Sequence, residues 1–279
     1  MLLKRLISAA ALMAVILPLV WLGGTLYLAA AVAVALLAAW EYAGMLAQAG
    51  QRPSRALLFG LAGLLPLEAH LRSQLPALAS LLPWPGLLPP TSSLLQDLLT
   101  ATILLSLIGQ VLRQDLRQSL ANWSVSLAGG LYIGLPISYF VLLRGLPDGL
   151  YWVLLVLLCT WACDTCAFLA GTTFGRHGFF THISPKKTLE GAIGGIAGGS
   201  ATALLAIPLL NVPPLHAFAL GVAISVASTF GDLAESLIKR QLSAKDSGST
   251  IPGHGGVLDR IDSALFAVVV AYLYASWIS

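Results

Sequence analysis

The stretch "LYWVLLVLLCTWACDTCAFLAGTT" (residues 150–173) decides how this chain can fold, because it is a long apolar run that contains a single carboxylate, Asp164. A helix of about 20 apolar residues crosses the ~30 Å hydrocarbon layer of a membrane, so the run predicts a transmembrane helix. A bare carboxylate at that depth costs a few kcal/mol or more. We therefore expect Asp164 to face a cavity, a cation or a metal ion.

The composition extends this prediction to the whole chain of 279 residues, which is 57% hydrophobic and only 10% charged. Soluble domains carry about 25% charged residues, so a soluble fold would lack the polar surface to cover its core. We expect an all-α, polytopic membrane helix bundle with about nine transmembrane helices. The expected spans are 6–22, 25–47, 56–71, 92–112, 119–143, 150–173, 189–211, 215–238 and 261–279.

Two of these spans have a second interpretation. The first resembles a secretory signal, since Lys4 and Arg5 precede its apolar stretch. A second apolar span follows at once, so we predict an uncleaved first helix. The third span is the weakest, because Pro66, Glu68 and His70 interrupt it, and it could be a short or re-entrant helix.

The distribution of basic residues predicts the orientation, because cytoplasmic loops carry an excess of Lys and Arg. If the N-terminus is cytoplasmic and nine spans alternate, 13 of the 15 basic residues lie inside, and only Arg72 and Arg144 lie outside. The C-terminus then lies outside. The net charge of +3 is thus a topology signal. There is no basic patch interleaved with aromatic residues, so we expect no nucleic-acid partner.

The chemistry of the chain changes near its middle. Residues 1–150 hold few ionisable groups within the expected spans, which predicts a scaffold of N-terminal transmembrane helices with possible oligomer contacts. Residues 151–279 hold most of the intramembrane acids and are expected to form the catalytic region. Cys163 and Cys166 have the spacing of a zinc or redox pair, but no second pair exists, so we interpret them as small structural residues.

The eighth span carries "STFGDLAESLIKRQ" (228–241), in which Asp232, Glu235 and Lys239 lie on one helical face. This stripe places two acids in the membrane with a base toward the cytoplasmic end. An internal salt bridge between Glu235 and Lys239 is the plain alternative to a functional site. Asp232 lies deeper and is the stronger candidate for binding a metal or substrate.

The loop "KDSGSTIPGHGGVLDRID" (245–262) concentrates ionisable residues beside glycines. Pro252 and the glycines exclude a regular helix and let the backbone approach a ligand closely. Asp259 and Asp262 share a face as the last span begins, although Asp262 could instead cap the helix or form a salt bridge. Arg260 offers a planar fork suited to phosphate. His254, set among these charges, is expected to be functional.

A second loop, "HISPKKTLEGAIGG" (182–195), places Ser184, Lys186 and Lys187 before the start of the seventh span. Anions bind at helix N-termini, and adjacent lysines add point charges. The alternative is that the lysines anchor the loop at lipid headgroups. Glu190 fits the first turn of the helix as a capping residue, and the glycines of 191–200 predict close helix packing.

Hard carboxylate oxygens beside phosphate-binding cations suggest Mg²⁺, which is held by one or two carboxylates together with substrate phosphates. The two loops are expected to face the cytoplasm at the depth of the lipid headgroups. Together these features predict a phosphoryl or nucleotidyl transfer between a nucleotide and a lipid.

The segment "SLIKRQLSAKDSGSTIPGHGGVLDRID" (236–262) resembles the signature of the phosphatidate cytidylyltransferase family, also called CDP-diacylglycerol synthases. "SPKKTLEGAIGG" (184–195) and "DTCAFLAG" (164–171) are similar to upstream motifs of that family, although Phe168 stands where the family often has Tyr. Every fixed position of the signature is present: Ser236, Lys239, Arg240, Lys245, Asp246, Pro252, His254, Gly255, Gly256, Asp259, Arg260 and Asp262.

The resemblance implies that CTP and phosphatidate react to give CDP-diacylglycerol and pyrophosphate. It also implies dependence on Mg²⁺ bound by Asp232 and Asp259, a homodimer, and a bacterial inner membrane with the active site facing the cytoplasm. The implied catalytic residues are Asp232, Lys239, Asp246, His254, Asp259 and Arg260. The implied substrate-binding residues are Ser184, Lys186, Lys187, Lys239, Arg240 and Lys245.

Two rival functions fit parts of the pattern. A CTP-dependent kinase of a polyprenol-like alcohol would transfer the γ-phosphate and release CDP. A secondary transporter would use the intramembrane acids as a proton or cation relay, which predicts acids along a path through the membrane. Here the acids gather on one side of the membrane, which disfavours a transporter. A purely structural scaffold gives no reason to retain buried acids.

Overall fold

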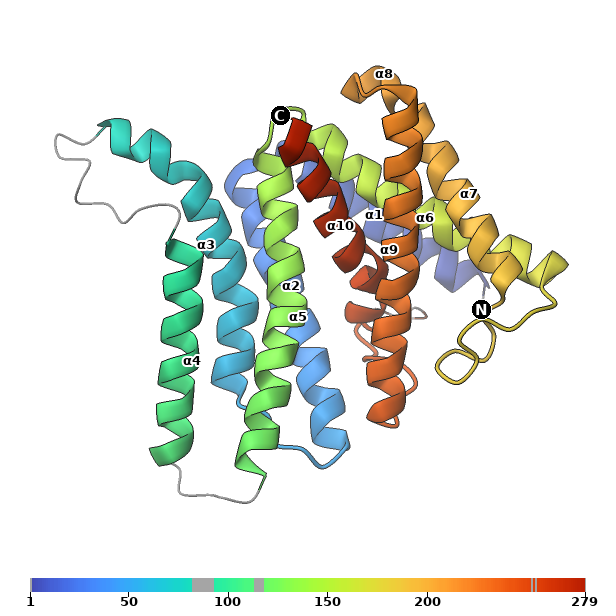
Figure 1. The fold of residues 1–279 in the computed structure, drawn as a ribbon. Helices are drawn as coiled ribbons and strands as arrows, with labels where there is room; N and C mark the ends of the chain where they lie inside the picture. The colour runs from blue at the N-terminus through green and yellow to red at the C-terminus, as the bar shows by residue number, and fades with distance from the viewer. Residues whose placement is uncertain (1, 82–92, 113–117, 252, 254, 279) are drawn as a thin grey trace. The chain divides into compact units, whose positions relative to one another are not determined.

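The structure, a computed structural model, describes residues 2–81, 93–112, 118–251, 253 and 255–278 (Figure 1). These residues form ten helices, and their only β-structure is two isolated bridges, so the all-α prediction is confirmed. The helices are α1 (Leu2–Leu22), α2 (Gly24–Gln48), α3 (Arg55–Leu81), α4 (Leu94–Leu112), α5 (Ser119–Gly145), α6 (Gly149–Phe174), α7 (Leu189–Leu205), α8 (Ile207–Leu210), α9 (Pro214–Gln241) and α10 (Leu258–Ile278).

Six helices within the described residues are long and apolar enough to cross a membrane: α2, α4, α5, α6, α9 and α10. The apolar stretches of α1 and α7 are shorter, and α3 contains Pro66 and Pro76. Several such helices in one chain indicate a multi-pass membrane protein. The count of nine spans and the orientation of the termini stay predictions.

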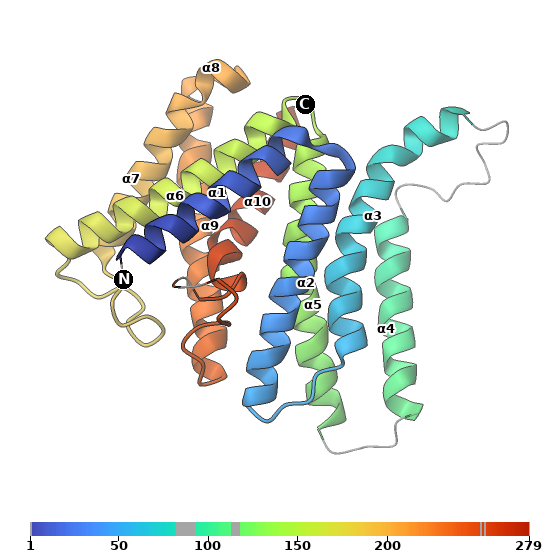
Figure 2. The same cartoon turned by 180° about the vertical axis from the view of Figure 1, so that it is seen from behind.

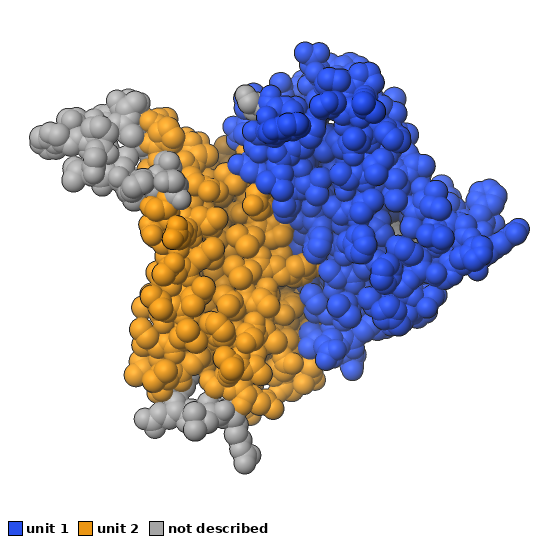
Figure 3. Space-filling view, viewed as in Figure 1, with its two compact units in different colours: residues 1–23, 143–279 blue, residues 24–142 orange. Residues whose placement is uncertain are grey.

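The described chain divides into two compact units, which Figure 3 shows in different colours. Unit 2 comprises Gly24–Leu142 and so contains α2, α3, α4 and most of α5. Leu57, Leu61 and Leu65 form a buried row on α3. Gly134 of α5 packs against this row so closely that an added Cβ would lie 2.7 Å from the carbonyl oxygen of Leu61. Small residues therefore set the helix spacing in this unit.

The polar side chains of unit 2 mostly bond to backbone groups. The Tyr42 hydroxyl donates to the carbonyl oxygen of Val125 at 3.3 Å. The backbone N–H of Ser54 donates to Oγ of Ser126 at 2.8 Å, next to the start of α3. The bond at Ser54 satisfies an amide at the start of α3, and both bonds tie neighbouring helices together, so they have a structural role.

Unit 1 comprises Met1–Gly23 and Leu143–Ser279. Its α6 packs most extensively on α7, which lies beside it (Figure 1). The two backbones approach closely because α7 presents glycines: a methyl group at Gly194 would overlap the Cβ of Ala170, and one at Gly198 would overlap Sγ of Cys166. The predicted small-residue packing face is therefore confirmed. Helices α9 and α10 pack on each other, and α9 also packs on α7.

The first helix belongs to unit 1, where α1 contacts α6 (Figure 2). The Arg144 guanidinium fastens its C-terminal end, donating from Nε to the carbonyl oxygen of Val20 at 2.8 Å and from Nη2 to that of Trp21 at 3.2 Å. The last carbonyl groups of a helix lack partners within the helix. Arg144 thus satisfies two of them and holds the end of α1.

Candidate active site

A pocket with a volume of about 380 Å³ lies within unit 1. It is bounded by the second half of α6, the loop before α7, the first turn of α7, and α9. Two acids and two lysines line it: Asp164, Asp232, Lys186 and Lys187. The remaining lining residues are Cys163, Ala167, Phe168, Gly171, Thr172, Phe179, Thr188, Gly191, Ala192 and Thr229. The pocket therefore joins acids from two membrane helices to two lysines from a loop.

Two of the lining residues, Lys187 and Asp232, form an ion pair. Nζ of Lys187 lies 2.8 Å from Oδ2 of Asp232, and the two side chains are 23% and 35% exposed. Oδ1 of Asp232 accepts a hydrogen bond from the Ser236 hydroxyl at 3.3 Å. Asp164 is close enough to interact electrostatically with Asp232, Lys187 and Arg260. Because both side chains of the ion pair remain partly accessible, each can bind a ligand in place of its present partner.

Lys186 and Lys187 lie in the loop between α6 and α7, the lysine loop (residues 175–188). Thr188 caps α7, its side chain accepting from the backbone N–H of Gly191 at 3.1 Å, so the helix begins where the sequence predicts. The Arg240 guanidinium donates from Nε to the carbonyl oxygen of Ile183 at 3.1 Å. Arg240 thus fastens the loop to the C-terminal end of α9.

A second charged cluster, formed by Glu235, Lys239 and Asp259, lies deeper in unit 1. Nζ of Lys239 lies 2.7 Å from Oδ1 of Asp259 and also contacts the carboxylate of Glu235. The Lys239 side chain is only 15% exposed and that of Glu235 is fully buried. The salt bridge between Glu235 and Lys239 that the sequence allowed is therefore present. The Lys239 ammonium contacts the carboxylates of Glu235 and Asp259. Its contact with substrate stays a prediction.

Asp259 organises the loop that precedes α10. Its Oδ2 accepts from both the backbone N–H and the hydroxyl of Ser247, each at 2.9 Å, and from the N–H of Gly256 at 2.8 Å. Gly255 has φ +81°, and an added Cβ there would lie 2.6 Å from Oδ2 of Asp259. The predicted need for glycine in this loop is confirmed at this position.

The structure brings some predicted site residues together and leaves others apart. Asp232, Lys186 and Lys187 meet in the pocket, whereas Lys239 and Asp259 meet in the deeper cluster. The Ser184 backbone N–H donates within the loop to the Phe180 carbonyl at 3.0 Å. The exposed predicted residues are Lys186, Arg240, Lys245, Asp246 and Arg260. Pro252 and His254 lie outside the described residues.

Asp262 links the two groups of charges. It is 8% exposed and interacts electrostatically with Asp232, Asp164 and Lys239. Its Oδ1 accepts from the backbone N–H of Ser263 at 2.7 Å. Because Asp262 lies beyond the first turn of α10, which begins at Leu258, it does not cap this helix, although the sequence had allowed that role. The pocket and the deeper cluster are therefore parts of one electrostatic network.

The donor set fits a magnesium ion at the pocket. Among the described residues, no three His, Cys, Asp or Glu side chains are grouped as a ready-made metal site. Magnesium needs only one or two carboxylates, because phosphates and water supply its other ligands. Asp232 and Asp164 both line the pocket and could supply these oxygens. Asp259 fits less well, since both its oxygens already accept from other groups.

Sequence reasoning missed several residues of the site. The predicted site residues do not include Asp164, although its isolation in an apolar run is a signal for a functional acid and the structure places it in the pocket. Ser247 supplies two donors to Asp259, and only its position inside the signature could have suggested this. Phe179 and Thr229 line the pocket, and nothing in the sequence marks them.

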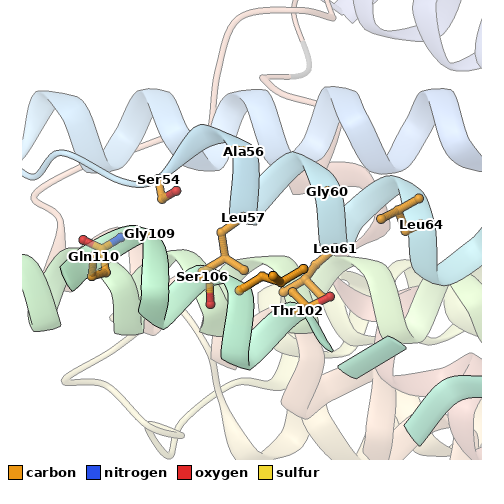
Figure 4. Close-up of a pocket in the computed structure, with 11 residues that line it drawn as sticks. Ser54, Ala56, Leu57, Gly60, Leu61, Leu64, Thr102, Ser106, Gly109 and Gln110 are labelled. Carbon is orange, nitrogen blue, oxygen red and sulfur yellow. The ribbon is translucent and has the colours of Figure 1, made fainter. Parts of the chain in front are cut away.

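A pocket of similar size, about 340 Å³, lies between α3 and α4 within unit 2 (Figure 4). Its lining residues are Ser54, Ala56, Leu57, Gly60, Leu61, Leu64, Thr102, Leu105, Ser106, Gly109 and Gln110. None of these side chains is ionisable. The unit 2 pocket therefore lacks groups that could neutralise a phosphate or hold a metal ion.

Comparison with known proteins gives consistent results. A sequence model described as the cytidylyltransferase family matches residues 3–278. A phosphatidate cytidylyltransferase of Synechocystis is 32% identical over 283 residues, which cover 97% of this chain and 95% of the relative. One of Bacillus subtilis is 39% identical over 147 residues, 52% of this chain and 54% of the relative. A chloroplastic one of Arabidopsis thaliana is 50% identical over 115 residues, 40% of this chain and 29% of the relative.

Proposed function

The chain belongs to the cytidylyltransferase family, and we propose that it transfers CMP from CTP to phosphatidate, giving CDP-diacylglycerol and pyrophosphate. An oxygen of the phosphatidate phosphate attacks the α-phosphorus of CTP, and the bond from that phosphorus to the bridging oxygen of the β-phosphate breaks. The observation that carries the proposal is the unit 1 pocket, where Asp164 and Asp232 meet Lys186 and Lys187.

The residues of the pocket suit an alignment mechanism. The phosphatidate phosphate is already an anion, so no strong general base is needed. Catalysis then consists mainly of bringing two anions together and neutralising the charge that develops on the leaving pyrophosphate. Lys186 and Lys187 supply positive charge at the mouth of the pocket. The ion pair of Lys187 with Asp232 opens when phosphate arrives, so Lys187 exchanges a carboxylate for a phosphate oxygen.

Magnesium is the cofactor that this donor set supports. When bound, Mg²⁺ neutralises charge on the triphosphate and helps to orient it. Asp232 would hold it in the pocket, with Asp164 beside it as a second source of carboxylate oxygen. For Asp259 to serve as the second ligand, as the signature implies, its oxygens would have to give up Lys239 or the donors from Ser247 and Gly256.

We propose that the deeper cluster supports the loop before α10. Lys239 fixes Asp259, and Asp259 fixes the loop at Ser247 and Gly256. That loop carries Lys245, Asp246 and His254, and the first turn of α10 carries Arg260. For these four residues we propose contacts with the phosphates of either substrate. Ser184 and Arg240 shape the lysine loop, Ser184 through its backbone and Arg240 through its bond to Ile183.

The membrane setting follows from the charge distribution. We propose nine spans with a cytoplasmic N-terminus and an external C-terminus, which place the pocket at the inner leaflet, where CTP is available. The expected location is a bacterial inner membrane, and the expected oligomer is a homodimer. The assignment of residues 1–150 as scaffold and 151–279 as catalytic region also stays a prediction.

An assay with two labels separates this reaction from its rivals. Purified protein in detergent receives phosphatidate, Mg²⁺ and CTP labelled either on cytosine or on the γ-phosphate. The cytosine label should enter the lipid phase while the γ label appears as pyrophosphate, and chelation of Mg²⁺ should stop both. A γ label in lipid, or transfer to a polyprenol instead of phosphatidate, would favour the kinase. Solute counterflow in proteoliposomes without lipid labelling would favour a transporter.

A further inference from the structure

Glu190 does more than complement the N-terminus of its own helix. It lies in the first turn of α7, where a carboxylate favours the helix dipole. However, the capping bond comes from Thr188, and the Glu190 side chain reaches back to the other side of the lysine loop. Oε2 accepts from the backbone N–H groups of Arg176 at 3.1 Å and His177 at 3.2 Å.

His177 completes this contact through its side chain. Its Nδ1 lies 2.6 Å from Oε1 of Glu190, and Nδ1 donates because an ionised carboxylate only accepts. Both oxygens of Glu190 are thus bonded to the segment that enters the loop, although the His177 side chain is 75% exposed. Hydrogen bonds to a charged acceptor are stronger than neutral ones.

The segment that Glu190 contacts leads into a two-stranded neck, which residues 177–179 and 187–189 form. Residues 177–179 run antiparallel to residues 187–189: the Phe179 N–H donates to the Lys187 carbonyl and the Leu189 N–H to the His177 carbonyl, each at 2.9 Å. An isolated β-bridge pairs Gly178 with Thr188. Lys187 lies on this neck, and its side chain reaches Asp232. The position of the neck therefore determines where the Lys187 ammonium lies.

We infer that Glu190, together with His177, is a positioning element that closes the neck of the 179–187 loop and so aims Lys187 at the phosphate site. This inference rests on the proposed function for the identity of the phosphate, but the closure of the neck can be tested without it. The contacts predict the order in which the variants open the neck. Glu190→Ala loses all three bonds and should have the largest effect. Glu190→Gln loses the charge of the acceptor, and His177→Ala loses one bond.

The first arm of the test measures the neck directly. Each variant in detergent is treated briefly with trypsin, and cleavage after Lys186 and Lys187 is followed by mass spectrometry. Opening of the neck should accelerate cleavage by about tenfold in Glu190→Gln, since bonds to a charged acceptor are lost, and more in Glu190→Ala. Glu68→Gln is the matched control, because it removes a carboxylate that pairs with Arg72 in unit 2. Equal cleavage in Glu190→Gln and the wild type would overturn the inference.

The second arm separates positioning from general stability. Glu190→Gln should raise KM for Mg–CTP by about tenfold, because a small misplacement of a binding group is costly, while KM for phosphatidate and the melting temperature stay unchanged. In a Lys187→Met background, Glu190→Gln should change KM for CTP by less than about twofold. A full effect in that background would show that Glu190 does not act through Lys187. If the wild-type enzyme failed to use CTP, the proposed function would fail, and the trypsin arm would still decide the inference.

Discussion

The two units hold pockets of nearly equal volume, about 380 Å³ in unit 1 and about 340 Å³ in unit 2, but very different chemistry. The unit 1 pocket has two acids and two lysines in its wall, whereas the unit 2 pocket has leucines, glycines, hydroxyls and one amide. In the membrane, hydroxyls satisfy backbone groups at little cost, but charges need partners. We therefore expect the charges that line the unit 1 pocket to serve binding or catalysis.

The largest effect should come from the acid of the charged pocket. Asp232→Asn removes the carboxylate that pairs with Lys187 and would hold the metal, while it preserves size. We expect CDP-diacylglycerol formation to fall by at least about 100-fold, measured as cytosine label in lipid. The folded yield in detergent should be unchanged. Activity within tenfold of the wild type would remove Asp232 from the site.

A smaller effect, on stability, should come from the deeper cluster. Lys239→Met removes the ammonium between Glu235 and Asp259 and leaves two carboxylates without their cation. Breaking a buried ion pair in this way costs about 3–5 kcal/mol, so the melting temperature in detergent should fall markedly. Adding Glu235→Gln should restore part of the loss. A Lys239→Met protein as stable as the wild type would mean that the cluster is not a structural support.

Helix packing offers a matched pair of glycines, one from each unit. Gly194→Ala should cost about 1–3 kcal/mol, because its methyl group would overlap Ala170 and push α6 from α7. Gly60→Ala should change stability by less than about 1 kcal/mol, since nothing lies within 4 Å of the added Cβ. Thermal unfolding of the two variants gives the comparison, and the reverse order would contradict the packing described for both units.

The smallest effect should come from a hydroxyl of unit 2. Tyr42→Phe loses one hydrogen bond to the Val125 carbonyl at 3.3 Å, which is worth about 1 kcal/mol at most. KM for CTP and KM for phosphatidate should both stay at the wild-type values. A change in either constant would show that unit 2 takes part in substrate binding and would weaken the contrast between the units.

Composition and the length of the apolar runs predicted much of the fold, because a chain with so few charges has few alternatives to a membrane helix bundle. The predicted start of α7 at residue 189 is confirmed, with Glu190 in its first turn. The role of Glu190 was not predictable, because its partners at Arg176 and His177 depend on how the loop turns back. Spacing along α9 gave the pairing of Glu235 with Lys239, but it could not show that Asp259 shares the same ammonium.

The residue types of the site could be predicted from the sequence. Their arrangement in space could be predicted only in part. Asp232 and Lys187 lie 45 positions apart in the chain, so their ion pair depends on how α9 packs beside α7. The hydrogen bonds that Asp259 accepts from Ser247 and Gly256 likewise depend on the turn at Gly255. Local sequence patterns carry no information on such long-range contacts.

Electron paramagnetic resonance of Mn²⁺, used in place of Mg²⁺, tests most directly whether the unit 1 pocket holds the metal–nucleotide complex. Purified wild-type protein should bind Mn²⁺ in a CTP-dependent manner, and Glu68→Gln in unit 2 should bind it equally well. Asp232→Asn should lose this CTP-dependent signal while remaining folded. Binding of Mn–CTP by Asp232→Asn as tight as that of the wild type would contradict the account.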